Sequence, residues 1–361
     1  MELKIKTLEL QEMVSKVIKC SSNNKLIPIT SLMSIKVDGG VLTLTTTDAT
    51  NYFYVSKPNV VCEDFEVSVM ADLFTKLVQK MTSENIVLKV KGELGLVVVK
   101  GNGSYTMELP LDENGHTIKF PKKLKDGFRR LYGTVKLTTI KSILNYNKPS
   151  IATSIELPSL TCYYCGENVV TSDRFKICSN AVKLCEEPVL IPAQLMELLG
   201  VLSGDEIDVS ITTEKELVFE SNDDTIYAPV TEGIDTFPVS AIMSLVESDF
   251  EANCKVNKNE VLSLIDRLNL FVSPYDKRAV RMTFTNDGIM FSSKKSSGVE
   301  LVKYVENSAP TDYTCMIDIE MLKSQIASQE KDVIELYYGS EVAIKLVSND
   351  IVQIIALAED D

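Results

Sequence analysis

Apolar and polar positions along the chain follow one pattern three times. Each copy starts with the end of an apolar strand and the first residues of a helix, at residues 69–74, 191–196 and 317–322. These starts lie 122 residues apart (69 to 191) and 126 residues apart (191 to 317). Such a spacing is typical of whole domains, since solenoid repeats are far shorter. We therefore expect the chain to fold into three similar domains.

In every copy this start is followed by an amphipathic helix, a polar turn and three segments in which apolar and polar residues alternate as in β-strands. The expected strands are 85–90, 94–100 and 104–109 in the first copy, 206–211, 216–220 and 225–230 in the second, and 332–338, 342–347 and 351–357 in the third. The copies share this order and spacing more than they share individual residues. One helix and three strands thus make up the second half of each domain.

The first half of each domain also consists of a helix followed by strands, and this helix too has one apolar face. The apolar positions of these helices are Leu10, Met13, Val14, Val17 and Ile18 in the first domain, Ile140, Ile143 and Leu144 in the second, and Val261, Leu264, Ile265 and Leu268 in the third. Turn residues at 38–40 and 286–288 then predict hairpins. The pattern predicts an α+β fold of three similar domains, each with two helix-plus-strands units, at 1–128, 129–246 and 247–361.

Composition narrows the class of protein. A chain of 361 residues that is 45% hydrophobic can build two or three cores without disulfides or structural metal ions. No apolar run approaches the length that crosses a bilayer, and the first residues lack a signal-peptide pattern, so we expect a soluble, cytoplasmic protein. The eight cysteines are scattered along the chain, as is typical of a reducing compartment.

The net charge of −14 is unevenly distributed. Nine basic and nine acidic residues fall within the six expected helical windows, so the whole excess of negative charge lies outside them. The windows are 8–20, 71–82, 137–150, 192–203, 257–272 and 318–330. If the helices share one surface, that side is nearly neutral and the opposite side is acidic. Many soluble proteins are mildly acidic, however, so charge alone leaves a nucleic-acid partner open.

Residues suited to catalysis or metal binding are sparse. His116 is the only histidine and lies beside a turn signal, and no glycine-rich phosphate loop occurs. Cys162 and Cys165, with Cys178 and Cys185, suggest a zinc site at first. Their strand context argues against one, because positions i and i+3 of a strand face opposite sides. We expect no enzyme activity, no cofactor and no metal ion.

Five segments stand out together, at 25–29, 42–48, 169–177, 235–238 and 280–284. They resemble segments of bacterial sliding clamps, the β subunit of DNA polymerase III. The resemblance spans nearly the full length and depends on the order and spacing of the segments together with the threefold repeat. It implies a head-to-tail homodimer whose domains surround duplex DNA, with helices inside and a continuous sheet outside. DNA would then be held by topology rather than by tight contact, and the sequence by itself leaves the oligomeric state open.

The resemblance implies that lysines on or beside the expected helices line the interior of such a ring. The candidate DNA-binding residues are Lys25, Lys76, Lys80, Lys141, Lys148 and Lys323. A basic stretch at 119–130, between the first two domains, is not typical of the family. It is either a solvated linker or an auxiliary contact with DNA or a partner.

The resemblance also implies a pocket between the second and third domains that captures short peptides from polymerases, the clamp loader and repair proteins. The candidate pocket residues are Ala152, Ser172, Arg174, Phe175, Lys176, Ile177, Pro238, Ile242, Met243, Ile354, Ile355, Ala356 and Leu357. Lys176 replaces the usual arginine, Ala152 and Ile242 differ from commoner residues, and residues 358–361 depart from the usual ending. We therefore expect the peptide preference of this pocket to differ from that of the family, as in a phage or mobile-element clamp that serves its own polymerase.

Ring closure requires the first domain of one chain to meet the third domain of another. Exposed strand edges favour such pairing, here between residues 105–109 and 299–305. The candidate interface residues are Tyr105, Met107, Leu109, Phe271, Val272, Val299, Leu301 and Lys303. The alternative to a DNA-encircling clamp is an interaction scaffold that has the clamp fold without encircling DNA.

Overall fold

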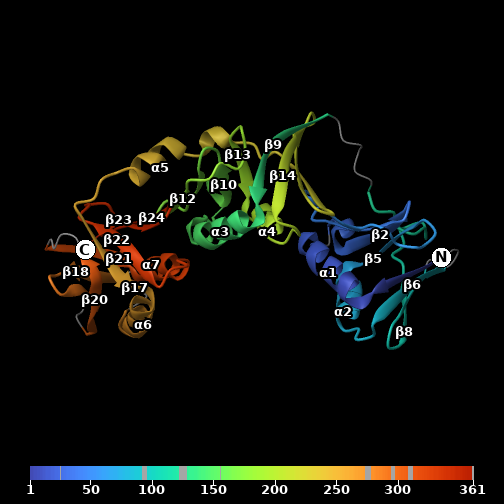
Figure 1. The fold of residues 1–361 in the computed structure, drawn as a ribbon, viewed down its shortest axis with the longest axis horizontal. Coiled ribbons are helices and arrows are strands. Elements are labelled where there is room, and N and C mark those ends of the chain that lie inside the picture. The colour runs from blue at the N-terminus through green and yellow to red at the C-terminus, as the bar shows by residue number, and fades with distance from the viewer. Residues whose placement is uncertain are drawn as a thin grey trace. The chain divides into compact units, whose positions relative to one another are not determined.

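The computed structural model describes residues 1–24, 26–91, 96–121, 128–154, 156–272, 278–293, 297–307 and 312–359 (Figure 1). The chain forms two compact units. One comprises residues 1–138 and 197–230, and the other comprises residues 139–196 and 231–361. The first unit thus holds the first domain and part of the second, and the second unit holds the rest of the second domain with the third.

All the expected helices form. They are α1 (Thr7–Val17), α2 (Ala71–Gln79), α3 (Leu137–Asn147), α4 (Ala193–Leu199), α6 (Lys258–Leu268) and α7 (Ile319–Ala327). Short 3₁₀ turns, η1 (Ile18–Cys20), η3 (Lys148–Ser150) and η6 (Asn269–Phe271), follow α1, α3 and α6, which accounts for the longer windows expected there. A further helix, α5 (Val239–Val246), was not expected. None of the helices in the described ranges is long and apolar enough to cross a membrane.

Local sequence explains where these helices begin and which face they bury. The Asn257 side chain accepts hydrogen bonds from two backbone N–H groups in the first turn of α6, and Asp318 does the same for α7. Such N-caps satisfy donors that have no partner within the helix. On α1, the expected apolar face is buried through Leu10, Met13 and Val17.

In the first unit, the described strands form two antiparallel sheets. One has the order β1-β6-β7-β8, and the other has the order β5-β2-β3-β4-β16-β15-β14-β9. The strands are β1 (Glu2–Lys6), β2 (Leu32–Asp38), β3 (Val41–Thr47), β4 (Tyr52–Lys57), β5 (Phe65–Met70), β6 (Asn85–Lys91), β7 (Leu96–Lys100), β8 (Ser104–Glu108), β9 (Arg129–Lys136), β14 (Glu206–Thr212), β15 (Glu216–Ser221) and β16 (Asp224–Pro229). Pairing of β4 with β16 carries the second sheet from the first domain into the second.

In the second unit, the described strands form one antiparallel sheet of order β13-β10-β11-β12-β24-β23-β22-β17-β20-β19-β18-β21. The strands are β10 (Cys162–Cys165), β11 (Val169–Ser172), β12 (Lys176–Asn180), β13 (Val189–Pro192), β17 (Ala252–Asn257), β18 (Ala279–Phe284), β19 (Gly288–Ser293), β20 (Val299–Asn307), β21 (Tyr313–Asp318), β22 (Val333–Tyr338), β23 (Ala343–Ser348) and β24 (Ile351–Ala356). Here β12 pairs with β24, so the sheet continues from the second domain into the third. The expected boundaries at 128/129 and 246/247 fall at the start of β9 and the end of α5, and they stay predictions.

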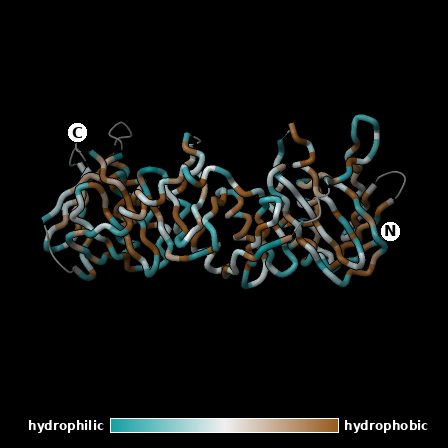
Figure 2. The backbone as a smooth tube through the Cα atoms, turned by 90° about the horizontal axis from the view of Figure 1, so that it is seen from above, coloured by the Kyte–Doolittle hydropathy of each residue, from teal (hydrophilic) through white to brown (hydrophobic). Residues whose placement is uncertain are grey.

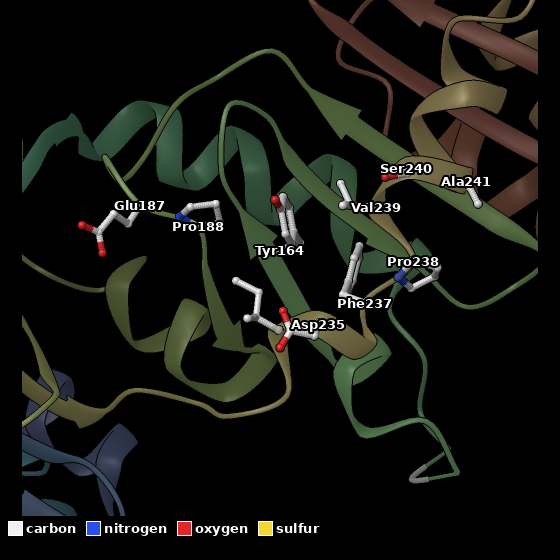
Figure 3. Close-up of a pocket in the computed structure, with 10 residues that line it drawn as sticks. Tyr164, Glu187, Pro188, Asp235, Phe237, Pro238, Val239, Ser240 and Ala241 are labelled. Carbon is white, nitrogen blue, oxygen red and sulfur yellow. The ribbon is translucent and has the colours of Figure 1, made fainter.

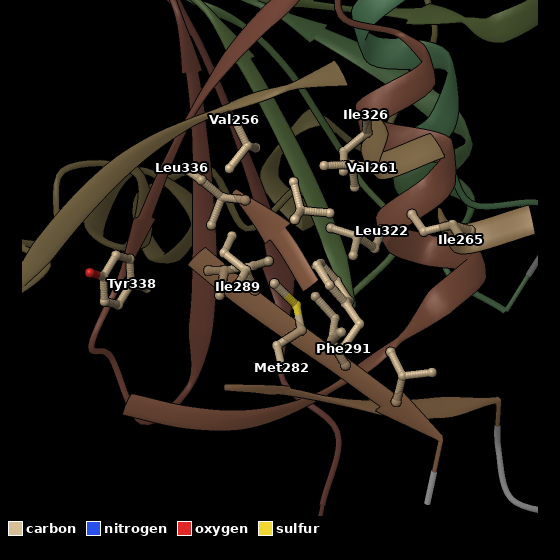
Figure 4. Close-up of a cluster of buried hydrophobic side chains, with 14 of the residues drawn as sticks. Val256, Val261, Ile265, Met282, Ile289, Phe291, Leu322, Ile326, Leu336 and Tyr338 are labelled. Atoms are coloured by element: carbon tan, nitrogen blue, oxygen red, sulfur yellow. The ribbon is translucent and has the colours of Figure 1, made fainter. Parts of the chain in front are cut away.

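The core of the third domain lies between α6, α7 and the strands that they cover (Figure 4). Val261 and Ile265 from α6 meet Leu322 and Ile326 from α7 in one buried cluster with strand residues such as Phe291. Hydrophobic and hydrophilic residues alternate in short stretches along the backbone (Figure 2). This alternation buries one face of each element and leaves the other polar.

A buried polar network joins the second domain to the third within the second unit. The Gln353 amide nitrogen donates to the Tyr146 carbonyl oxygen (2.9 Å) and to Ser328 Oγ (2.9 Å). Gln325 of α7 donates to Ser150 Oγ (2.6 Å), next to α3. Since buried polar groups are costly when unpaired, these bonds fix α3 against α7 and β24 in one register. The network explains why residues 139–196 belong to the same unit as the third domain.

We predict that Gly288→Ala lowers the free energy of unfolding by about 1–3 kcal/mol, the usual range for overpacking. A Cβ at Gly288 would lie 2.1 Å from the Val302 carbonyl oxygen on the neighbouring strand, which the β19–β20 pairing does not allow to move away. Urea unfolding followed by circular dichroism measures the change. Asp287→Ala, an exposed neighbour, is the control, and equal stability of the two variants would contradict the prediction.

Candidate functional site

Several predicted pocket residues gather around one apolar cluster of the second unit. Ile177 from β12, Ile242 from α5 and Ile354 from β24 are buried together there. Ala152 and Met243 are partly buried against the same cluster. Helix α5 therefore covers β12 and β24 and supplies the wall that the sequence had assigned to residues 238–243 without recognising a helix.

The last strand contributes less than expected. Ile354 belongs to the cluster beneath α5, whereas Ile355 is buried in the third-domain core, and Leu357 packs against that core too. Adjacent side chains of a strand point to opposite faces, so four consecutive residues cannot form one floor. The placement of Ile355 and Leu357 in the pocket is therefore wrong. Ala356 has the same parity as Ile354, and its N–H donates to the Phe175 carbonyl oxygen (2.8 Å).

A tight turn between β11 and β12 sets the rim of the pocket. The Asp173 carboxylate accepts hydrogen bonds from the N–H groups of Phe175 (3.0 Å) and Lys176 (2.7 Å), and Arg174 takes a positive φ of 81°. Ser172 Oγ accepts from the Arg174 N–H (3.2 Å). The turn leaves Phe175 56% exposed, two residues before Ile177 of the apolar cluster. Lys176 is drawn to Asp173 instead (Nζ–Oδ2 3.2 Å) and has only 14% of its side chain exposed.

A cavity of about 590 Å³ lies on the domain-two side of α5 (Figure 3). Its walls include Tyr164 and Phe237, whose rings stack with centroids 5.2 Å apart. Pro238 was a predicted pocket residue, but Tyr164, Phe237 and Val239 were missed in that role. The sequence offered segment 235–238 and the strand 162–165 as separate features. Only the folded chain places them together, because about 70 residues separate them in sequence.

Lys345 of β23 holds the C-terminal end of α5. Its ammonium group donates to the carbonyl oxygens of Val246 (3.4 Å) and Ser248 (2.8 Å). It also lies over the Phe250 ring, 4.6 Å from the centroid, and 5.6 Å from that of Tyr337. A cation at this position stabilises the unpaired carbonyl groups that end a helix. Burial lowers the pKa of Lys345, although the nearby Asp249 acts in the opposite direction.

The predicted DNA-binding lysines differ in how available they are. Lys76 pairs with Asp72 (2.7 Å), and Lys323 pairs with Asp266 (2.7 Å), an interaction that raises the pKa of Lys323. Lys80, Lys141 and Lys148 are exposed at or beside α2 and α3. Lys25 lies outside the described residues.

The basic stretch at 119–130 is described only in part, because residues 122–127 lie outside the described ranges. Arg129 binds within the first unit, donating to Tyr227 Oη (2.6 Å) and pairing with Glu220 (2.8 Å). Arg130 lies over the Tyr132 ring, 4.9 Å from its centroid. Arg129 thus contributes to the sheet rather than to a solvated linker.

The cysteines lie in an environment that disfavours metal binding. Cys162 and Cys165 lie in β10, as expected from the sequence. Burial raises the pKa of Cys185 to about 12 and also raises that of Cys178, so both thiols stay protonated at neutral pH. No group of three or more potential metal-ligating side chains occurs within the described part of the chain. His116 is an exposed turn residue whose ring nitrogen lies 3.7 Å from Asp112.

Two strand edges in the terminal domains carry the predicted interface residues. β8 is an edge strand of its sheet. β20 pairs with β19 along residues 299–303, while its pairing with β17 involves only residues 304–307. Tyr105 and Phe271 are 47% and 54% exposed, and Leu270, not named from the sequence, is 83% exposed.

Some of the named interface residues do not present their side chains. Met107 and Leu109 are buried in the first domain, so only their backbone groups could contribute to an interface. Val272 packs against the third-domain core. Val299, Leu301 and Lys303 are exposed along β20.

Comparison with known structures identifies the fold. Over its whole length the chain has the fold of the crystal structures of the DNA polymerase beta subunit from Streptococcus pyogenes (17% identity, TM-score 0.85, 99% of this chain and 100% of that one) and of the DNA polymerase sliding clamp from Bacillus subtilis (18% identity, TM-score 0.84, 100% of both chains). DNA polymerase III subunit beta from Borrelia burgdorferi is similar too (16% identity, TM-score 0.85, 100% of both). The protein therefore has the three-domain sliding-clamp fold, and this fold prediction is confirmed.

The first domain adds evidence from sequence. Residues 1–115 match the family model described as "DNA polymerase III beta subunit, N-terminal domain". The resemblance to bacterial β sliding clamps is therefore confirmed, by sequence family in the first domain and by fold throughout. A comparison with the sequences of curated proteins finds no match.

We predict that Lys345→Met loosens α5 and lowers the free energy of unfolding by about 1–2 kcal/mol, because the carbonyl and ring contacts are lost while the cost of burying the charge is relieved. Hydrogen exchange read by mass spectrometry would show faster exchange in residues 239–248. Lys331→Met removes an exposed lysine bonded to Asn349 in the same unit and serves as the control. Unchanged exchange in Lys345→Met would show that Lys345 does not hold the helix.

Proposed function

We propose that this protein is a DNA sliding clamp, a processivity factor that encircles duplex DNA as a head-to-tail homodimer and tethers a replicative polymerase. The observation that carries the proposal is the family match of residues 1–115 in a chain that has the sliding-clamp fold throughout. The protein acts without catalysis, cofactor or metal ion and works in the cytoplasm. Its eight cysteines, all free thiols, suit that compartment.

Ring closure would use the edge strand β8 of one protomer and the first half of β20 of the next. Two edges with unpaired backbone groups favour addition of strand to strand, and exposed Leu270 and Phe271 supply an apolar contact beside them. A heterologous contact of this kind, made twice, closes a two-fold ring.

Contact with DNA would be weak and independent of sequence. Lys80 and Lys141 are exposed, and Lys76 and Lys323 are each partly neutralised by a carboxylate. Lys148 is exposed as well. Few net positive charges reach the phosphates, and the chain as a whole is acidic. Such a balance lets the protein move along the duplex, because phosphate affinity rises steeply with the number of neutralising cations.

Partner proteins, including a polymerase, a clamp loader and repair proteins, would dock short peptides in the pocket around Ile177. Phe175 and Met243 offer an apolar surface over a buried floor, which suits an apolar peptide anchor. Because Lys176 is engaged by Asp173, the rim provides less positive charge than an unpaired arginine would. The peptide preference is expected to differ accordingly.

Retention on circular DNA tests the encircling role. After loading by its clamp loader, the protein should stay on closed circular DNA through gel filtration in about 0.5 M salt, where loose phosphate contacts are screened. Cutting the circle once with a restriction enzyme should release it. Equal retention on circular and linear DNA would instead favour a clamp-fold interaction scaffold that does not encircle DNA.

Substitution at the proposed subunit contact tests the ring itself. We predict that native mass spectrometry of the wild-type protein gives twice the mass of one chain, and that Leu270→Lys with Phe271→Glu shifts most of it to the monomer, since charges would be buried against an apolar surface. Val61→Lys is the control, because Val61 is an exposed apolar residue between β4 and β5 of the first domain. A double variant that stays dimeric would place the subunit contact elsewhere.

A further inference from the structure

The 3₁₀ turn η6, which ends α6, presents two large apolar side chains to solvent. These are Leu270 and Phe271. Leu268 before them is buried, and Val272 after them packs against the third-domain core. The turn is therefore anchored at both ends and projects in the middle. We call Leu270 and Phe271 the apolar knob.

The apolar knob lies beside the start of β20, a strand that contacts α6 (Figure 1). Gly298, directly before this strand, is so close to the knob that an added Cβ would lie 3.3 Å from Cδ2 of Phe271. From the last turn of α6, Arg267 donates to the Glu300 carboxylate on β20 through Nε (3.1 Å) and through Nη2. Residues 299–303 of β20 are the part that does not pair with β17. Apolar side chains and a strand edge thus lie together, as the proposed subunit contact requires.

The backbone of the turn holds the apolar knob only weakly. Its closing hydrogen bond, from the Val272 N–H to the Asn269 carbonyl oxygen, is 3.4 Å long. Its N-cap makes no side-chain hydrogen bond. Short 3₁₀ turns have poorer hydrogen-bond geometry than α-helices, and exposed side chains gain little packing within one protomer. The position of the apolar knob therefore depends on contacts from other elements.

Glu320 of α7 provides such a contact. Its Oε1 accepts a hydrogen bond from the side-chain amide of Asn269, the first residue of η6 (2.7 Å), at a partly buried position. Hydrogen bonds to a carboxylate are stronger than those between neutral groups. Glu320 is itself fixed in the first turn of α7, where its N–H donates to the Asp318 N-cap (2.8 Å). The ion pair of Lys323 with Asp266 (2.7 Å) joins the same two helices one turn away, so η6 is tied to a helix that packs in the core.

We propose that Glu320 is a positioning residue of the subunit contact, which holds Asn269 and so presents the apolar knob beside β20 before the partner arrives. The inference rests on the proposed head-to-tail homodimer and adds the residue that orders its contact. A loop that is ordered in advance loses less conformational freedom on association. Glu320 would in this way slow dissociation of the ring while acting only through Asn269.

Subunit exchange tests the proposal. Isotope-labelled and unlabelled protein are mixed, and native mass spectrometry follows the appearance of the mixed dimer, whose rate reports dissociation. Glu320→Ala removes the acceptor and should exchange about threefold faster per contact, and about tenfold faster for a ring that contains the contact twice. Glu320→Gln keeps an acceptor oxygen and should exchange nearly as the wild type does.

Reversal of donor and acceptor gives the sharper test. Asn269→Asp alone places two carboxylates together and should speed subunit exchange at least about tenfold. Adding Glu320→Gln to Asn269→Asp restores the hydrogen bond in the opposite direction, so exchange should return to within about threefold of the wild-type rate. Recovery would identify the bond between the two side chains as the cause.

Thermal unfolding separates positioning from a merely structural role. The background is Leu270→Lys with Phe271→Glu, in which the subunit contact is expected to contribute nothing. There, Glu320→Ala should lower the unfolding midpoint by less than about 2 °C, because the bond lies at the edge of the core. A larger fall would make Glu320 a structural residue and overturn the proposal.

Glu330→Ala replaces an exposed glutamate beyond the end of α7 and is the matched control, which should exchange as the wild type does. Exchange of Glu320→Ala at the wild-type rate, or no recovery in Asn269→Asp with Glu320→Gln, would overturn the proposal. A wild-type protein with the mass of one chain would instead overturn the homodimer and this inference with it, so the two failures give different results.

Discussion

Antiparallel main-chain pairing across domain boundaries is the interaction on which the rest of the structure depends. In the first unit β4 pairs with β16, and in the second unit β12 pairs with β24, so each sheet continues from one domain into the next. Backbone hydrogen bonds of this kind cannot slip by one residue without turning every side chain to the wrong face. They make one sheet in each unit continuous across a domain boundary. The edges on β8 and on the first half of β20 lie outside these pairings and are the surfaces that the proposed ring would use.

Buried polar contacts reinforce the pairing at each junction. In the second unit Gln353 and Gln325 bind α3 and its following turn to the third domain. In the first unit the buried Asp224 carboxylate accepts from Ser203 (Oγ, 2.6 Å) and lies 3.3 Å from the Lys16 ammonium group of α1. Apolar packing alone would tolerate small rotations between domains, whereas directional bonds in a dry interface do not. The proposed ring would need that kind of fixed geometry at its domain junctions.

Helix α5 forms one wall of the proposed peptide pocket. It buries Ile242 toward the strands that carry Ile177 and Ile354, and Val239 and Met243 pack against the same cluster. Lys345 fixes its C-terminal end, and the stacked Tyr164 and Phe237 rings support the segment before its first turn. A short helix without a side-chain N-cap would not be stable alone, so the pocket depends on these tertiary contacts.

The sequence by itself determined the threefold architecture, because periodicity, turn residues and caps act over a few neighbours. The helix at 8–20, the hairpin at Asn286–Gly288 and the strand at 351–357 all follow from such local signals, and the structure has each of them. The sequence could not show that Ile355 points away from the apolar cluster that holds Ile354. Nor could it show that Lys176 binds Asp173 or that Tyr164 lies against Phe237. Those outcomes depend on which strands become neighbours and which face each presents, and residues far apart in sequence meet only when the chain is folded. The tertiary structure alone decided the shape and charge of the binding surfaces, since a pocket is made of side chains whose proximity no local pattern records.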